Sequence, residues 1–246
     1  MSRRHRLDAE LVDQGFFSTQ DEAMRAVLAG EVSTTSRRLD RPGEQVPFGI
    51  PLHVRGRSSY VSRGGLKLAH GLDELGVDVR GRHCLDVGCS TGGFTDCLLR
   101  RGAASVLAVD VGYAQFDWTL RQDPRVTLVE RTNVLDLPAL PEARRVSLAV
   151  CDVSFTSVLT ILPAVCQLLE PQGQFLTLVK PQFEVPREQV GAGGVVRDAT
   201  ARRQALEDVA RGMRHAGFCV VGSCVSPIRG RKGNEEFLLL GTLATQ

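Results

Sequence analysis

Three lysines, Lys67, Lys180 and Lys232, stand among 27 arginines in this chain of 246 residues. Arginine keeps its proton in proteins, whereas a lysine becomes a neutral base when burial or a neighbouring cation lowers its pKa. In a chain that otherwise uses arginine for positive charge, a retained lysine is a candidate for chemistry. Lys180 follows an apolar run and precedes Pro181, at the carboxyl end of a predicted strand, where open α/β sheets bind ligands.

Carboxylates accompany two of these lysines. Asp152 ends another apolar run, and Glu235 and Glu236 precede a third. Because successive side chains of a strand point to opposite faces, only one of the two glutamates can face a site. A set made of Lys67, Asp152, Lys180 and one of these two glutamates could remove a proton from a poor nucleophile such as a hydroxyl group, with the acids orienting both ammonium groups. Taken singly, Lys67 could be a solvated helix residue and Asp152 a strand-end cap.

A glycine-rich turn follows the first strand of the larger predicted domain, in the segment Cys84-Leu-Asp-Val-Gly-Cys-Ser-Thr-Gly-Gly-Phe-Thr95. Its glycines let the backbone approach a ligand, and the helix that begins there offers N–H groups. Asp110 closes the next strand, where a carboxylate can hold the hydroxyls of an adenosine ribose. A dinucleotide fingerprint needs a glycine at the position of Ser90. The turn instead resembles the S-adenosylmethionine motif of class I methyltransferases.

That resemblance implies S-adenosyl-L-methionine as the cofactor and a set of residues that would bind it. These residues are Asp86, Gly88, Ser90, Thr91, Gly92, Gly93, Phe94, Asp110, Val111, Asn133 and Asp152. Asn133 would lie near the adenine. An almost equally strong interpretation makes it a helix N-cap or turn residue.

The fourth predicted strand ends in Asp152-Val-Ser-Phe155. The residues of this segment indicate which kind of atom such a site could methylate. Enzymes that methylate an exocyclic base nitrogen generally have two prolines where this chain has Val153 and Ser154. Methylation of a pyrimidine carbon needs an activated cysteine, and Cys151 lies in an apolar run with no activating neighbour evident. Both base chemistries therefore lose support. The ordered Lys-Asp-Lys-Glu set resembles that of FtsJ-type ribose 2'-O-methyltransferases.

Residues 66–243 alternate strand and helix patterns. The apolar runs end at Gly88, Asp110, Val129, Asp152, Lys180 and Val225, with a last run over residues 236–240. This alternation predicts an α/β fold with a doubly wound parallel sheet and helices on both faces. It is the Rossmann-like architecture that the resemblance to class I S-adenosylmethionine-dependent methyltransferases implies.

Residues 1–57 predict a separate small α/β domain. Helical stripes run from Leu7 toward Gly15 and from Asp21 to Ala29, and extended pieces follow at 31–33 and 45–46. This order resembles the S-four-type RNA-binding module, which is named for a ribosomal protein. We expect a linker over residues 58–65 and the methyltransferase domain over residues 66–246.

The net charge of +2 is too small for RNA binding by overall charge, so phosphate contacts would come from local arginines. The candidates are Arg3, Arg4, Arg6, Arg37, Arg38 and Arg41 in the small domain, Arg63 in the linker, and Arg229 and Arg231 before Glu236. For each of them taken alone, a solvated surface charge is the stronger interpretation.

The composition excludes several classes of protein. Hydrophobic residues make up 43% of the chain and charged residues 24%, as in ordinary globular proteins. The seven cysteines show neither metal-ligand spacing nor a C-x-x-C pair, so we expect no metal and reduced thiols. The sequence contains neither a run of about 18 apolar residues nor a secretion signal. We therefore expect a cytoplasmic protein that does not engage a membrane.

Motifs along the whole chain resemble one family closely. Beside the glycine-rich turn and Asp152-Val-Ser-Phe155, they are Tyr60-Val-Ser-Arg-Gly-Gly-Leu-Lys-Leu68, Asp110-Val-Gly-Tyr113, Arg131-Thr-Asn133, Val179-Lys-Pro-Gln-Phe-Glu184 and Gly194-Val-Val-Arg-Asp198. In this order they resemble the TlyA (hemolysin A) family. One departure is Ala192, which stands where that family usually has a basic residue.

The resemblance implies a bacterial ribosomal RNA 2'-O-methyltransferase that acts on cytidine in rRNA or a ribosomal subunit. Its catalytic residues would be Lys67, Asp152, Lys180 and Glu236, since the family places its acid directly before an aromatic residue, here Phe237. The shorter members, which this chain also resembles, imply large-subunit RNA as the substrate. The alternatives are a methyltransferase acting on an RNA base and a hemolysin-like protein, as the family's old name suggests.

Overall fold

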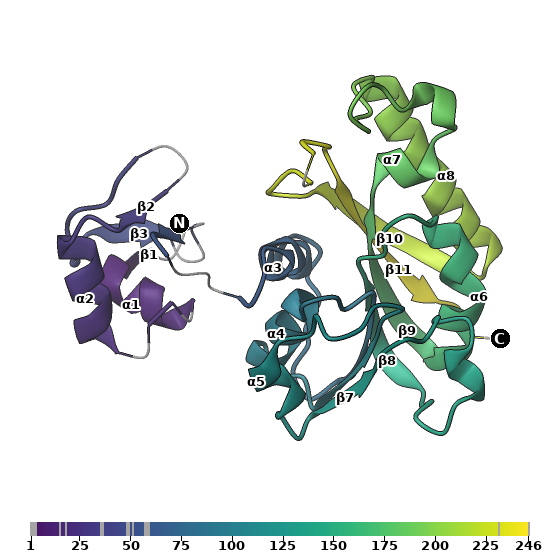
Figure 1. Ribbon diagram of the computed structural model, residues 1–246, viewed down its shortest axis with the longest axis horizontal. Coiled ribbons are helices and arrows are strands. Elements are labelled where there is room, and N and C mark those ends of the chain that lie inside the picture. The colour runs from purple at the N-terminus through teal and green to yellow at the C-terminus, as the bar shows by residue number, and fades with distance from the viewer. Residues whose placement is uncertain are drawn as a thin grey trace. The chain divides into compact units, whose positions relative to one another are not determined.

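The computed structural model describes residues 4–14, 16–17, 19–34, 37–47, 50, 52–56, 60–230 and 232–245 (Figure 1). The chain divides into two compact units, Met1–Val61 and Ser62–Gln246. Helix α3 (Gly64–Glu74) begins inside the segment that the sequence assigned to a linker. The last two residues of that segment are therefore helical.

The described residues of the N-terminal unit form two short helices and two small antiparallel strand pairs. The elements are β1 (Arg4–Arg6), α1 (Leu7–Asp13), α2 (Gln20–Leu28), β2 (Val32–Ser33), β3 (Gln45–Pro47) and β4 (His53–Val54). Strand β1 pairs with β3, and β2 pairs with β4. Leu7, Leu11 and Val27 are fully buried, as the helical spacing of the apolar residues predicts. The sequence did not predict β1 and β4, because strands of two or three residues carry too little pattern.

Within the described part of the larger unit, seven strands form one sheet. They are β5 (His83–Val87), β6 (Ser105–Val109), β7 (Val126–Val129), β8 (Val146–Cys151), β9 (Leu169–Val179), β10 (Phe218–Val225) and β11 (Phe237–Leu243). Their order across the sheet is β10-β11-β9-β8-β5-β6-β7. Neighbours from β9 to β7 are parallel, whereas β11 is antiparallel to both β9 and β10. The doubly wound α/β fold is as predicted, and the sheet is parallel except at β11, whose antiparallel direction the sequence did not specify.

Helices cover both faces of this sheet (Figure 1). Besides α3, they are α4 (Gly93–Arg100), α5 (Trp118–Arg121), α6 (Val158–Leu168), α7 (Pro181–Glu184) and α8 (Ala199–His215), with 3₁₀ turns at η1 (Leu137–Ala139) and η2 (Arg187–Gln189). Helices α3, α4 and α5 lie on one side, and α6 and α8 lie on the other. Central strand residues such as Leu85, Leu107 and Leu148 are consequently fully buried, which explains the unbroken apolar runs in the sequence.

The strand directions bring five chain segments to one edge of the sheet. The residues that directly follow β5, β6, β8 and β9 are Gly88, Asp110, Asp152 and Lys180. Strand β11 contributes its amino end to the same edge, because it is antiparallel and Phe237 pairs with Val179. A parallel β11 would have carried Glu236 to the opposite edge. The antiparallel pairing instead puts Glu236 next to the strand end that carries Lys180.

Helix α3 approaches β11 through a glycine. A Cβ atom on Gly71 would lie 2.8 Å from Cδ2 and 3.3 Å from Cβ of Leu238. Gly71 lies one helical turn after Lys67, on the same face of α3. This contact therefore sets how closely the helix that carries Lys67 can approach β11.

We expect Gly71→Leu to lower the free energy of unfolding by about 1–3 kcal/mol, despite the better helix propensity of leucine, because the added side chain overpacks this contact. Urea denaturation measures the change. Glu74→Leu, at an exposed position of the same helix, serves as the control and should change the value by less than about 0.5 kcal/mol. Equal values for the two variants would contradict the close packing of α3 on β11.

Candidate active site

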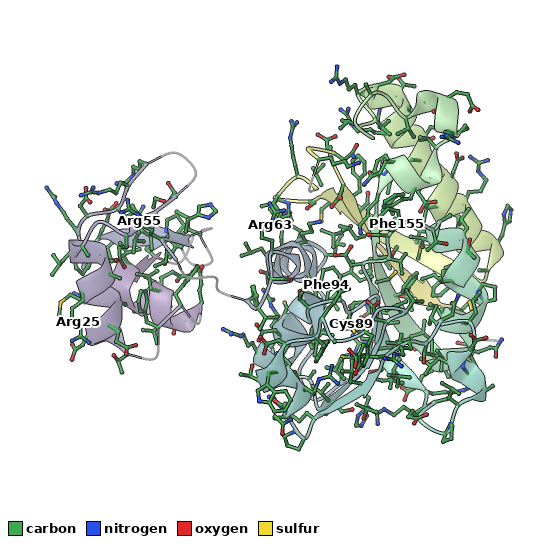
Figure 2. The ribbon with its side chains drawn as sticks, in the orientation of Figure 1. Arg25, Arg55, Arg63, Cys89, Phe94 and Phe155 are labelled. Carbon is green, nitrogen blue, oxygen red and sulfur yellow. The ribbon has the colours of Figure 1, made fainter. Side chains whose placement is uncertain are left out.

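A pocket of about 690 Å³ lies at this edge of the sheet in the larger unit. Lys67 lines it from α3, and the glycine-rich turn lines another part. The lining residues that follow β8, follow β9 or precede β11 include Asp152, Ser154, Phe155, Lys180, Gln182, Phe183 and Glu236. Figure 2 labels Arg63, Cys89, Phe94 and Phe155, which also belong to the lining. All four residues of the predicted Lys-Asp-Lys-Glu set thus border one pocket.

The four residues form two ion pairs. Nζ of Lys67 lies 2.5 Å from Oε2 of Glu236, and Nζ of Lys180 lies 2.6 Å from Oδ1 of Asp152. Lys180 also donates a hydrogen bond to the hydroxyl oxygen of Ser154 at 2.8 Å. Lys180 is 7% exposed and Glu236 is 3% exposed. Because these charges are largely shielded from water, each depends on its partner, and removal of one partner would leave the other uncompensated.

Glu235 and Glu236, which directly precede β11, have different surroundings. Nε of Arg202 lies 3.1 Å from Oε1 of Glu235, whereas Glu236 lines the pocket. The sequence predicted one cluster in which both acids orient both lysines. In the structure each lysine has a carboxylate of its own.

The glycine-rich turn packs closely against the loop that follows β8. Gly88 has a φ of +78°, and a Cβ atom there would lie 3.2 Å from the carbonyl oxygen of Asp152. Gly92, with a φ of +93°, is the N-cap of α4. The members of the predicted cofactor set that line the pocket are Gly88, Ser90, Thr91, Gly93, Phe94 and Asp152. The turn therefore forms a wall of small residues and backbone beside the two ion pairs.

The other predicted cofactor residues lie outside this lining. They are Asp86, Gly92, Asp110, Val111 and Asn133. The carboxylate of Asp110 accepts hydrogen bonds from the N–H groups of Ser90 at 2.8 Å and Gly112 at 2.6 Å, which ties the turn to the end of β6. Oδ1 of Asn133 accepts a hydrogen bond from the N–H of Leu135 at 3.1 Å. That bond is the turn geometry that the alternative interpretation of Asn133 describes.

Asp86 is a fully buried carboxyl group on β5. Its Oδ2 accepts a hydrogen bond from the hydroxyl of Thr95 at 2.7 Å. Burial raises the pKa of Asp86 to about 7, and the nearby charge of Asp152 adds to the rise, while the hydrogen bond from Thr95 opposes it. The side chain therefore joins β5 to α4, and it is out of reach of a ligand in the pocket.

Two buried cysteines lie close to the site. Cys89 lines the pocket and Cys151 ends β8. Burial raises the pKa of Cys151 to about 12, and it also raises the pKa of Cys89. Both groups remain thiols at neutral pH, so Cys151 lacks the thiolate that attack on a pyrimidine carbon requires.

Phe155 is a site residue to which the sequence analysis assigned no role. It is 92% exposed, yet it borders the pocket, and its φ of +65° is unusual for a residue other than glycine. The centroid of its ring lies 5.3 Å from that of Phe183. An aromatic face held in solvent beside a pocket that contains charged side chains can stack a planar ligand such as a nucleobase. The fourth position of Asp152-Val-Ser-Phe155 was the signal that could have identified it.

Four of the arginines predicted to contact RNA lie outside the small domain or at the start of the chain. They are Arg3, Arg63, Arg229 and Arg231. Arg3 and Arg231 lie outside the described residues. Arg63 lines the pocket, and Arg229 is exposed. Arg63 therefore shares the pocket with the Lys-Asp-Lys-Glu set, which is called the tetrad below.

A second hollow, of about 760 Å³, lies in the N-terminal unit and is lined by Arg37, Arg38 and Arg41. Arg37 pairs with Glu44, and Arg38 pairs with Asp40. The remaining described candidates, Arg4 and Arg6, contact the carbonyl oxygen of Gln45 and the carboxylate of Asp8. Most of these guanidinium groups are exposed and paired with acids of the same unit, so an RNA phosphate would have to displace those acids.

Among the described residues, no helix is both long and apolar enough to cross a membrane.

Comparisons with known proteins agree with this geometry. The model of the FtsJ-like methyltransferase family matches residues 60–242. YqxC of Bacillus subtilis (strain 168) is 46% identical over 240 residues, which are 97% of this chain and 85% of that protein. The 16S/23S rRNA (cytidine-2'-O)-methyltransferase TlyA of Mycobacterium tuberculosis (strain ATCC 25618 / H37Rv) is 44% identical and covers 97% of this chain and 90% of its own length. A solved structure from Streptococcus thermophilus, 42% identical, has a TM-score of 0.75 and covers 100% of this chain and 90% of that one.

The mostly parallel sheet, with its pocket at the carboxyl edge, defines a class I methyltransferase fold. The match to the FtsJ-like model extends over most of the chain, and the relatives match it almost from end to end. The chain belongs to the TlyA family of FtsJ-like methyltransferases.

We expect Asp86→Asn to stabilise the protein at high pH. The folded-state pKa of about 7 lies above the ordinary value of 3.8. Ionisation of Asp86 therefore lowers the stability of the wild-type chain as the pH rises from about 4 to about 7, whereas an amide does not titrate. The unfolding free energy of the variant, measured by urea denaturation relative to wild type, should rise by roughly 1–4 kcal/mol between about pH 5 and pH 8.

The control is Glu142→Gln, at an exposed position, whose difference from wild type should be small at both pH values. If the unfolding free energy of Asp86→Asn differs from that of wild type by the same amount at both pH values, the raised pKa of Asp86 is contradicted.

Proposed function

We propose that this chain transfers a methyl group from S-adenosyl-L-methionine to the ribose 2'-hydroxyl of a cytidine in ribosomal RNA. The observation that carries the proposal is the shielded contact of Lys180 with Asp152 in a pocket shared with the glycine-rich turn. A hydroxyl group is a poor nucleophile that needs a base, and a lysine in such a place can act as one. The printed name of the M. tuberculosis relative states this activity for that protein.

The residues of the glycine-rich turn fit the proposed cofactor. Gly88 has no space for a side chain against the loop after β8, which leaves backbone and small side chains to contact a ligand. The carboxylate of Asp110, fixed by two N–H groups, keeps lone pairs that could accept the hydroxyls of a nucleoside. S-adenosylmethionine, when bound, supplies a methyl group made electrophilic by the sulfonium centre. Ser90, Thr91 and Phe94 would hold it beside the tetrad.

The lysines divide the remaining work. Lys180 in its neutral form would take the proton of the 2'-hydroxyl as the oxygen bonds to the methyl carbon and the sulfur–methyl bond breaks, which would leave a neutral thioether. Asp152 and Ser154 hold Nζ in position for this step. Lys67, held by Glu236, supplies a positive charge at the same pocket. That charge favours negative charge on the reacting oxygen. The 2'-hydroxyl group can thereby lose its proton without a free hydroxide ion.

The two units would divide substrate recognition from chemistry. We propose that residues 1–57 bind ribosomal RNA, that residues 58–65 connect, and that residues 66–246 carry out methyl transfer. The hollow lined by Arg37, Arg38 and Arg41 supports RNA binding, since exposed guanidinium groups suit phosphate contacts. Arg63, which lines the pocket, would contact the RNA close to the target ribose.

We expect Lys180→Ala and Lys180→Arg to reduce methyl transfer to rRNA by at least about 100-fold, because neither side chain can take up the proton. Arginine keeps the positive charge, so it separates loss of a base from loss of a cation. Arg80→Ala, which removes an exposed ion pair with Asp78, is the control and should leave the rate unchanged.

The assay uses methyl-labelled S-adenosylmethionine and unmodified bacterial rRNA or ribosomal subunits, followed by alkaline hydrolysis. A methylated 2'-oxygen cannot attack its phosphate, so label retained in a dinucleotide identifies ribose methylation. Label released in single nucleotides would establish base methylation and would refute the proposed ribose chemistry. Full activity of Lys180→Arg would refute the role of Lys180 as base.

We expect Phe155→Ala to raise the KM for rRNA by roughly 5- to 100-fold, which corresponds to the loss of one base stacked on an aromatic ring. The affinity for S-adenosylmethionine, measured by calorimetry, should stay within about twofold of wild type, and Phe155→Trp should retain most of the activity. Val221→Ala removes another exposed apolar side chain, on β10, and is the control. An unchanged KM in Phe155→Ala would argue against a stacking platform.

A further inference from the structure

Glu184 connects two segments of the chain that carry active-site residues. It is the last residue of α7. Its Oε2 accepts a hydrogen bond from the hydroxyl of Ser157 at 2.6 Å, and its Oε1 accepts one from the N–H of Val158 at 2.9 Å. Ser157 is the N-cap of α6, where its oxygen accepts the N–H of Leu159 at 3.1 Å. The carboxylate therefore joins the end of α7 to the start of α6.

The joined segments are 152–157, after β8, and 180–184, after β9. The first carries Asp152, Ser154 and Phe155, and the second carries Lys180 and Phe183. They meet inside the pocket through the contacts of Lys180 with Asp152 and Ser154. They also meet through the two phenylalanine rings. Glu184 supplies a third connection and is not among the residues that line the pocket.

Both segments need such an external support. Helix α7 has four residues, and its N-cap, Lys180, makes no side-chain capping bond. An isolated turn of helix is not stable by itself. Phe155 holds a left-handed backbone conformation while 92% exposed. Such a conformation persists only where neighbouring structure imposes it, and burial of the ring contributes little here.

We propose that Glu184 is a positioning residue for methyl transfer, which sets the distance between the Lys180 segment and the Asp152–Phe155 segment. The inference rests on the proposed function, since it assigns those segments to base and substrate. Glu184 acts through them and touches neither substrate nor cofactor.

The test compares three substitutions of Glu184. In Glu184→Gln the amide oxygen still accepts the N–H of Val158, and its NH₂ group can donate to Ser157, so the geometry survives without the charge. Glu184→Asp keeps the charge but is one methylene shorter, and Glu184→Ala removes the connection. We expect kcat on rRNA to fall roughly 10- to 100-fold in the Ala and Asp variants and to stay within about threefold of wild type in Gln. The KM for S-adenosylmethionine should change by less than about twofold in all three.

Asp198→Ala is the matched control for loss of a helix cap. Asp198 caps α8 by accepting the N–H of Thr200 at 2.8 Å, and it does not line the pocket. A general loss of helix stability would affect Asp198→Ala and Glu184→Ala alike, whereas a positioning role predicts a fall in kcat in the Glu184 variant alone. Equal kcat values for wild type and Glu184→Ala would overturn the inference.

A crystal structure of Glu184→Ala provides a readout that does not depend on the substrate. The inference predicts that Phe155 leaves its left-handed conformation and that the contact between Lys180 and Asp152 lengthens. If both features persist unchanged, Glu184 is only a cap of α6 and the inference fails. Absence of labelled RNA with the wild-type chain, on naked rRNA and on ribosomal subunits alike, would instead overturn the proposed function and with it the role of Glu184.

Discussion

The antiparallel pairing of β11 with β9 is the constraint on which the site depends. The register that sets Phe237 against Val179 brings the acid before β11 to the strand end that carries Lys180. Helix α3 packs against the same strand, and the contact of Gly71 with Leu238 limits how closely the helix can approach it. Lys67 therefore reaches Glu236 because a helix and a strand meet at the closest distance that a glycine permits. Strand β11 thus positions Lys67, whereas Lys180 follows β9 and is held by Asp152 and Ser154 of the loop after β8.

The site concentrates charge where a protein core normally avoids it. Lys180 and Glu236 are buried beside their partners, and Asp86 lies fully buried on β5, which pairs with β8. Buried ion pairs repay their desolvation only partly, and well-packed apolar residues of similar volume are often as stable or more so. The energy that holds these charges in place must come from the apolar sheet around them. The large core of the unit is thus a requirement of the chemistry as well as of the fold.

Local patterns in the sequence predicted the strand ends, the glycine-rich turn and the pocket position of Lys180, because apolar runs and glycines report directly on burial and close approach. They could not predict the direction of β11, since alternation and hydrophobicity are the same for parallel and antiparallel strands at a sheet edge. Nor could they predict the burial of Asp86, because a carboxylate in a turn motif is as often a ligand as a structural group. The sequence also could not predict the exposure of Phe155, since an isolated aromatic residue is usually part of a core.

Cys89 lines the pocket, yet burial raises the pKa of its thiol and keeps it protonated at neutral pH. Electrophiles and oxidants react with the thiolate, so this sulfur is a poor target in spite of its location. Cys84 and Cys151, on the strands beneath, are inert for the same reason. Thiol-reactive inhibitors therefore find no reactive thiolate at Cys89, and reversible ligands are the better starting point for inhibitors. The same protonated state makes these three sulfurs slow to react with oxidants.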